Sequence, residues 1–114
     1  MKLLSKAQRD MLARNGQHIA IYGDDDLKPV VKLFTPDGNC TWLLVAIEPD
    51  FPDIAYGLCD LGLGTPEIGS VSLTEIANVR GILGLPVERD LHWVANRTLS
   101  EYADKAQSDG WIRS

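Results

Sequence analysis

The sequence predicts an α+β domain in which three helices pack on an antiparallel sheet of four to five strands, in the order α-β-β-β-β-α-β-α. Three observations predict this class. Capping-box sequences occur at three places, each followed by a glycine at a helical distance. Short strand-like segments with brief connections lie between the first two boxes, which is typical of an antiparallel meander. The length of 114 residues, with 45% hydrophobic and 24% charged, indicates one globular domain over residues 1–114.

The three capping boxes predict where the helices begin. In each, a Ser or Thr hydroxyl accepts a hydrogen bond from the backbone N–H three residues later, and a Gln or Glu side chain reaches back. The boxes are Ser5-Lys6-Ala7-Gln8, Ser72-Leu73-Thr74-Glu75 and Thr98-Leu99-Ser100-Glu101. Glycine commonly ends a helix because it adopts positive φ without strain. The expected stops are Asn15-Gly16 for the first helix, Gly81 or Gly84 for the second, and Gly110 for the third.

The first two strands are predicted as a hairpin. Residues 30–34 and 41–48 flank Pro36-Asp37-Gly38, in which proline presets φ for a turn and glycine accepts positive φ. The second strand is apolar on both faces, so we expect it near the centre of the sheet with both faces covered, at least in part. Trp42 lies in this strand and is expected in the core.

The third and fourth strands are predicted at residues 54–60 and 68–72, and a last strand at residues 87–94. The loop at 61–67 makes the glycine-rich block 56–69 a hairpin or its close relative. Four glycines in this block suggest backbone conformations closed to other residues, or close approach by another group. This block is therefore the first candidate for a functional centre.

The glycine-rich block only superficially looks like a dinucleotide fingerprint. Its third glycine, Gly69, follows Gly64 by five residues rather than three, and no lysine comes after it. Pro66 and Glu67 also stand where backbone donors would be needed. We expect a tight structural loop and no nucleotide cofactor.

The charge distribution constrains the partners. The net charge is −5, and residues 33–79 contain seven acidic side chains and no Lys or Arg. A stretch of this length without a cation cannot follow a phosphate backbone, which argues against direct nucleic-acid binding through it. A basic protein partner, including one that itself binds nucleic acid, is electrostatically compatible.

Metal, cofactor and membrane signals are weak throughout the sequence. His18 and His92 have no partner at metal-ligand spacing, and we expect no metal and no cofactor. Cys40 and Cys59 are interpreted as reduced, buried small residues rather than as a disulfide or catalytic pair. No apolar run is long enough for a signal peptide or a membrane span, so we expect no membrane association and a cytoplasmic location.

Several segments together resemble a known protein family. They are residues 4–9, 29–36, 41–44, 52–64, 66–69 and 84–90. They resemble a family of small single-domain bacterial proteins of unknown function, often encoded on plasmids and other mobile elements. The likeness covers almost the whole chain and is most specific from Asp53 to Gly69. The resemblance implies an accessory role on a mobile element and identifies no catalytic residue.

The function that these observations favour is a non-catalytic protein-interaction module. It would dock an acidic surface onto a basic, nucleic-acid-handling protein of the mobile element or its host. The surface is expected to comprise Asp50, Phe51, Asp53, Asp60, Gly62, Gly64 and Glu67. Asp60 and Glu67 are expected at the outer edge of the glycine-rich hairpin.

Two other functions stay open. The chain could be a small enzyme or ligand-binding protein with a pocket at the glycine-rich loop around Asp60 and Glu67, or a homodimer joined through an open sheet edge. A second surface is expected to comprise Glu88, Asp90, His92, Trp93 and Trp111. Trp111 follows the last helix, and we favour its packing in the core as a C-terminal anchor over an exposed position that is available to a partner.

Overall fold

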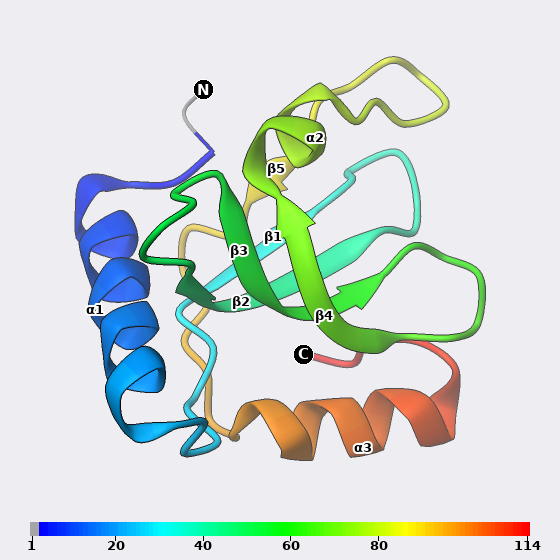
Figure 1. The fold of residues 1–114 in the computed structure, drawn as a ribbon. Coiled ribbons are helices and arrows are strands. Elements are labelled where there is room, and N and C mark those ends of the chain that lie inside the picture. Colours follow the sequence, from blue (N-terminus) through cyan, green and yellow to red (C-terminus); the bar gives the residue numbers. More distant parts are fainter. Residues whose placement is uncertain (1–2) are drawn as a thin grey trace.

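The computed structural model describes residues 3–114 and contains three helices and five strands (Figure 1). The elements are α1 (Lys6–Tyr22), β1 (Val31–Phe34), β2 (Thr41–Ile47), β3 (Ile54–Asp60), β4 (Glu67–Ser72), α2 (Leu73–Asn78), β5 (Glu88–Arg89) and α3 (Leu99–Asp109). This order and the antiparallel pairing confirm the predicted α+β class. None of the helices formed by residues 3–114 has the length and apolar character needed to cross a membrane.

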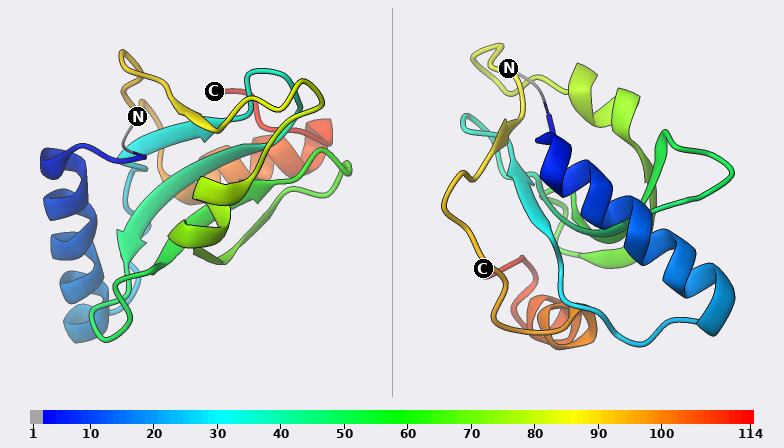
Figure 2. Two further views of the ribbon diagram at one scale, coloured as in Figure 1. Left: turned by 90° about the horizontal axis from the view of Figure 1, so that it is seen from above. Right: turned by 90° about the vertical axis from the view of Figure 1, so that its left-hand side faces the viewer.

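The sheet has the strand order β4-β3-β2-β1-β5. The first four strands form the predicted meander, and the chain then passes through α2 to the opposite edge, where β5 pairs with β1 (Figures 1 and 2). The predicted strand at 87–94 is wrong in length. After Asp90 donates its N–H to the Lys32 carbonyl at 3.0 Å, the chain leaves β1 and runs as a loop towards α3.

Strand β2 is the centre of the molecule, as predicted, and every side chain from Trp42 to Ile47 is buried. One face of the sheet packs against α1 and α2, and the other packs against α3. A bulge shifts the register between Leu44 and Ala46, so that Val45 and Ala46 both face α3. The buried β2 therefore supplies both layers of the core.

Helix α1 continues past its predicted stop. It extends to Tyr22 and is capped by Gly23 at φ +87°. Gly16 lies inside the helix, at its contact with strand β2. A Cβ atom at Gly16 would lie 1.8 Å from the carbonyl oxygen of Ile47, so only glycine lets the helix approach β2 this closely. The Asn15 side chain also donates to the Val45 carbonyl at 2.8 Å. The Asn15-Gly16 pair is thus a contact with the sheet rather than a helix end.

The other two helices differ in how well their ends were predicted. Helix α3 ends at Gly110, which is left-handed as expected. Helix α2 ends at Asn78, before both predicted glycines, because the following residues form a closed loop. The Asp37 carboxylate, from the turn between β1 and β2, accepts hydrogen bonds from two backbone N–H groups of that loop, those of Leu83 (2.7 Å) and Leu85 (3.2 Å). The loop tip leaves Ile82 92% exposed.

The Gly16 contact gives a first prediction. Gly16→Ala should lower the free energy of unfolding by about 1–3 kcal/mol or more, because the added methyl group meets backbone that cannot yield. Urea denaturation measures this change.

Gly69→Ala is the matched control. A Cβ at Gly69 meets nothing within 4 Å, and its φ is not positive. This variant should be neutral or more stable by up to about 1 kcal/mol. Equal stability of the two variants would contradict the assigned role of Gly16.

Candidate functional site

The residues predicted as one interaction surface lie at two ends of the molecule. Asp50, Phe51 and Asp53 belong to the turn between β2 and β3, whereas Gly62 and Gly64 belong to the loop after β3. Strand β3 has seven residues, which separates the two groups by about 20 Å. The expected continuous surface around the glycine-rich block is therefore not formed.

Asp60 is an internal residue and not an edge residue, which corrects its predicted position. Its side chain is 3% exposed. One carboxylate oxygen accepts from the N–H of Gly62 at 2.9 Å, and the other from the N–H of Ile112 at 3.0 Å. Gly62 has φ +78°, which suits glycine. Asp60 thus joins the glycine-rich loop to the C-terminal residues and presents no carboxylate to a partner.

Glu67 does not meet Asp60 in a pocket. Glu67 pairs across the sheet with Cys59, and successive side chains of a strand point to opposite faces. Asp60 and Glu67 therefore lie on opposite faces of the sheet. A hollow of about 730 Å³ beside the loop is lined by Asp60, Gly62 and Gly64 but not by Glu67.

The Asp53 carboxylate is hydrogen-bonded to residues at the start of α2. Its carboxylate accepts from the Ser72 hydroxyl (2.6 Å) and from the Thr74 hydroxyl and N–H (2.7 and 3.0 Å). These bonds, the one from Ser72 foremost, hold the pKa of Asp53 below its usual 3.8. Asp53 is exposed, yet it acts as a cap for a helix that begins 20 residues later in the sequence.

Two more aspartates serve backbone N–H groups in the same way. Asp26 accepts from the N–H of Ser100 at 2.8 Å, at the start of α3, and Asp37 holds the loop after α2.

Within residues 33–79, the acids without a side-chain hydrogen bond or ion pair among the described residues are Glu48, Asp50, Glu67 and Glu75.

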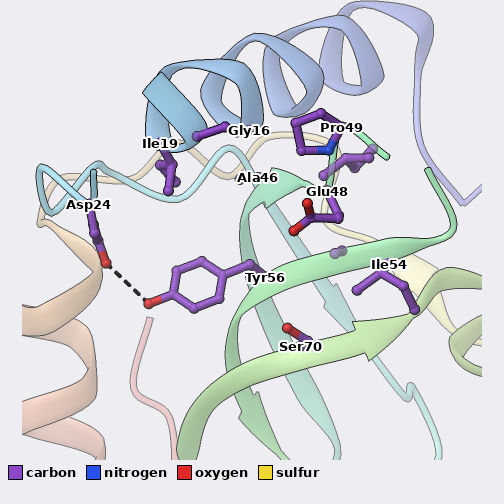
Figure 3. Close-up of a pocket in the computed structure, with 12 residues that line it drawn as sticks. Gly16, Ile19, Asp24, Ala46, Glu48, Pro49, Ile54, Tyr56 and Ser70 are labelled. Atoms are coloured by element: carbon purple, nitrogen blue, oxygen red, sulfur yellow. Dashed lines mark hydrogen bonds between the residues drawn. The ribbon is translucent and has the colours of Figure 1, made fainter. Parts of the chain in front are cut away.

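One of these free acids, Glu48, lines a cavity at the end of the sheet where α1 crosses it, and Asp50 follows it two residues later in the chain. The cavity has a volume of about 330 Å³ (Figure 3). It is lined by Gly16, Ile19, Ala20, Asp24, Ala46, Ile47, Glu48, Pro49, Ile54, Ala55, Tyr56 and Ser70. Its walls are mostly apolar, its two charged groups are both carboxylates, and no Lys or Arg is among the lining residues of the described chain.

Tyr56 provides the aromatic surface of this cavity. Its hydroxyl donates to the Asp24 carboxylate at 3.1 Å, and Figure 3 shows the ring lying across the cavity towards Asp24. Burial, followed by the negative charge of Asp24, raises the pKa of Tyr56 above 10.0. The phenol therefore stays protonated at neutral pH and keeps donating to Asp24.

Two exposed aromatic side chains belong to the chain segments that supply lining residues of the cavity. Phe51 is 65% exposed in the turn after β2, and Tyr22 is 72% exposed at the end of α1. We call the group of Tyr22, Asp24, Glu48, Asp50 and Phe51 the acidic end. It combines uncompensated negative charge, an apolar cavity and aromatic contact area, which can hold a cation that carries an apolar stem.

Only part of the acidic end was predicted from the sequence. Asp50 and Phe51 were predicted, whereas Asp24, Glu48 and Tyr56 were not assigned to a site. The reason is that Gly16 was interpreted as the end of the first helix. An expected helix stop there leaves Asp24 in a loop of unknown position, whereas a helix to Tyr22 carries it to the end of β2.

The second predicted surface is also divided. Trp93 is half-buried and packs on the Tyr102 ring, with 6.0 Å between ring centroids. His92 and Trp93 line one shallow hollow, whereas Asp90 and Trp111 line the hollow beside Asp60. Glu88 is exposed on β5.

The C-terminal anchor is the residue after Trp111. Ile112 is buried, whereas Trp111 is 52% exposed beneath the Arg113 guanidinium, which lies 4.8 Å from the ring centroid. The favoured core packing of Trp111 is therefore wrong, and Trp111 takes the alternative, an exposed position.

The cysteines are free thiols that are only partly exposed. Burial raises the pKa of Cys59 to about 11, and burial followed by the charge of Asp60 raises that of Cys40. Neither forms much thiolate at neutral pH, which makes both poor nucleophiles. Among residues 3–114, no three His, Cys, Asp or Glu side chains gather in a way that could hold a metal ion.

Comparison with known proteins adds a family and no activity. The sequence profile of a family described as "Protein of unknown function (DUF2958)" matches residues 3–113. No curated protein and no solved structure matches the chain.

The burial of Asp60 gives a stability prediction. Asp60→Ala should lower the free energy of unfolding by about 2–4 kcal/mol, because it leaves two backbone N–H groups without their acceptor. Asp60→Asn retains one carbonyl acceptor and should lose less. Glu67→Ala, at an exposed position of the same hairpin, should stay within about 0.5 kcal/mol of the wild type. Urea denaturation compares the three, and a neutral Asp60→Ala would contradict the assigned role.

The Asp53 cap gives a pH prediction. The folded-state pKa of Asp53 lies below 3.8, so its contribution to stability is complete above that value and is lost as the pH falls through the lower folded value. Asp53→Asn should remove this contribution and flatten the loss of stability in acid. Thr74→Val removes one hydroxyl donor and should give an intermediate profile. Thermal unfolding across acidic pH tests this, and parallel profiles for all three proteins would refute it.

Proposed function

The chain belongs to the DUF2958 family, whose function is unknown, and we propose that it is a non-catalytic protein-interaction module that binds a basic protein through its acidic end. This proposal keeps the predicted type of partner and moves the surface. The docking residues are Asp50 and Phe51 of the predicted set, joined by Tyr22, Asp24 and Glu48.

The observation that carries the proposal is the uncompensated charge of the acidic end. Glu48 and Asp50 are exposed and have no hydrogen-bond or ion-pair partner among the described residues. Complementary charge speeds the encounter between proteins and fixes their register. The exposed rings of Tyr22 and Phe51 add the contact area that interfaces favour.

Binding is better supported than the alternative of catalysis or ligand binding at the glycine-rich loop. That alternative needs Asp60 and Glu67 to act together, and they lie on opposite faces of the sheet. Both Asp60 oxygens already accept backbone hydrogen bonds.

The partner would carry a cluster of Lys and Arg, the surface that proteins use to bind nucleic-acid phosphates. An acidic end docked on that cluster would compete with nucleic acid. The mobile-element setting implied by the resemblance would supply such a partner among the proteins that defend against the element or transfer it. The open edge of β4 leaves self-association as a separate proposal that solution mass would test.

Affinity capture tests the proposed function. The wild type, an acidic-end double variant (Glu48→Gln with Asp50→Asn) and a control double variant (Glu67→Gln with Glu75→Gln) are immobilised and exposed to host lysate. Both double variants lose two charges at exposed positions, so they differ only in location.

The expected result is a basic protein that binds the wild type and the control but not the acidic-end variant. It should be released as salt rises from about 0.05 to about 0.5 M, because exposed charges are then screened. Retention that is equal on all three proteins, or insensitive to salt, would overturn the proposal.

A further inference from the structure

We infer that the cavity of the acidic end receives one arginine side chain of the basic partner, which the chain recognises by its guanidinium group. This inference rests on the proposed function and names the group that the site selects. It concerns the cavity itself, whereas the proposed function requires only the charge around it.

The walls of the cavity suit the stem of a long side chain. Ile19 of α1, Pro49 after β2 and Ile54 of β3 contribute apolar surface to a volume of about 330 Å³. An arginine stem consists of methylene groups, which gain free energy by leaving water for such a surface. A small acidic or polar side chain would gain nothing there.

The charged groups of the cavity suit the head of the side chain. Asp24 accepts from the Tyr56 hydroxyl through one carboxylate oxygen and from the N–H of Asp26 through the other, so each oxygen retains a free lone pair. Glu48 has no side-chain partner among the described residues and lines the same space. The cavity thus offers acceptors on two carboxylates, and its lining among residues 3–114 includes no competing cation.

Two features favour arginine over lysine. A guanidinium is planar and stacks on an aromatic ring such as Tyr56. It has five N–H donors and can bond two carboxylates at once, whereas an ammonium is a compact, strongly hydrated charge. Figure 3 shows the Tyr56 ring, Asp24 and Glu48 around one space, as this arrangement requires.

The cavity is already formed in the unbound protein. The approach of Gly16 to the Ile47 carbonyl fixes α1 against β2, and the Glu48 N–H donates to the Ile54 carbonyl at 2.8 Å. Asn15 holds the helix to the bulge of β2. Preformed walls reduce the entropy that binding must overcome, which favours recognition of a single side chain.

Three short peptides test the inference with defined probes: acetyl-Gly-Arg-Gly-amide, the same peptide with lysine, and the same peptide with citrulline, the neutral shape analogue of arginine. Amide NMR spectra of isotope-labelled protein report where each peptide binds. The arginine peptide should shift the signals of the cavity residues. The citrulline peptide should bind at least about tenfold more weakly, because the charge-assisted hydrogen bonds are lost, and the lysine peptide more weakly than arginine.

Ala20→Leu and Ala7→Leu form the matched pair of variants. Both residues are exposed alanines of α1, but only Ala20 lines the cavity. They lie about 20 Å apart along the helix. Ala20→Leu should fill the cavity without changing any charge and abolish the arginine shifts, whereas Ala7→Leu should leave them intact. Unchanged amide signals outside the cavity confirm that each variant is folded.

Equal binding of the citrulline or lysine peptide, or unchanged binding to Ala20→Leu, would overturn the inference. If the peptide results are negative but the captured partner still depends on Glu48 and Asp50, the docking is a flat charge contact and only the inference fails. If the arginine peptide fills the cavity and no captured basic protein depends on the acidic end, the proposed function fails instead.

Discussion

Carboxylates that accept hydrogen bonds from backbone N–H groups hold the connections of this fold in place. Asp26 serves the start of α3, Asp37 the loop after α2, Asp53 the start of α2, and Asp60 both the glycine-rich loop and the C-terminal residues. Such charge-assisted bonds are stronger than bonds between neutral groups. Within the 47 residues that contain no Lys or Arg, three of the seven acids, Asp37, Asp53 and Asp60, are therefore stabilised by peptide donors in place of cationic side chains.

This use of aspartate divides the acidic residues into two classes. Asp37, Asp53 and Asp60 are committed to the fold, whereas Glu48 and Asp50 are exposed and uncommitted. A count of negative charge along the sequence cannot separate them, because the donors lie far away in the chain. The proposed docking surface is accordingly smaller and more localised than the charge pattern alone predicts.

The sequence predicted local features well and distant ones poorly. The third strand was predicted at residues 54–60 as found, because alternation and turn chemistry are encoded nearby. The burial of Asp60 depends on Ile112, 52 residues away, which no local pattern signals. Gly16 was misread because a glycine at a close approach and a glycine at a helix end look alike in a single sequence. The cavity depends on that one distinction, since only a longer α1 brings Asp24 to β2.

The remote cap of α3 also bears on how the protein folds. Asp26 and Ser100 are separated by 74 residues, and the whole sheet lies between them in the sequence. Closing so long a segment costs chain entropy that is recovered only when the intervening strands have assembled. We expect this bond to form after the transition state. A weaker bond should then raise the rate of unfolding and leave the rate of refolding unchanged, and kinetic measurements of both rates distinguish the two effects.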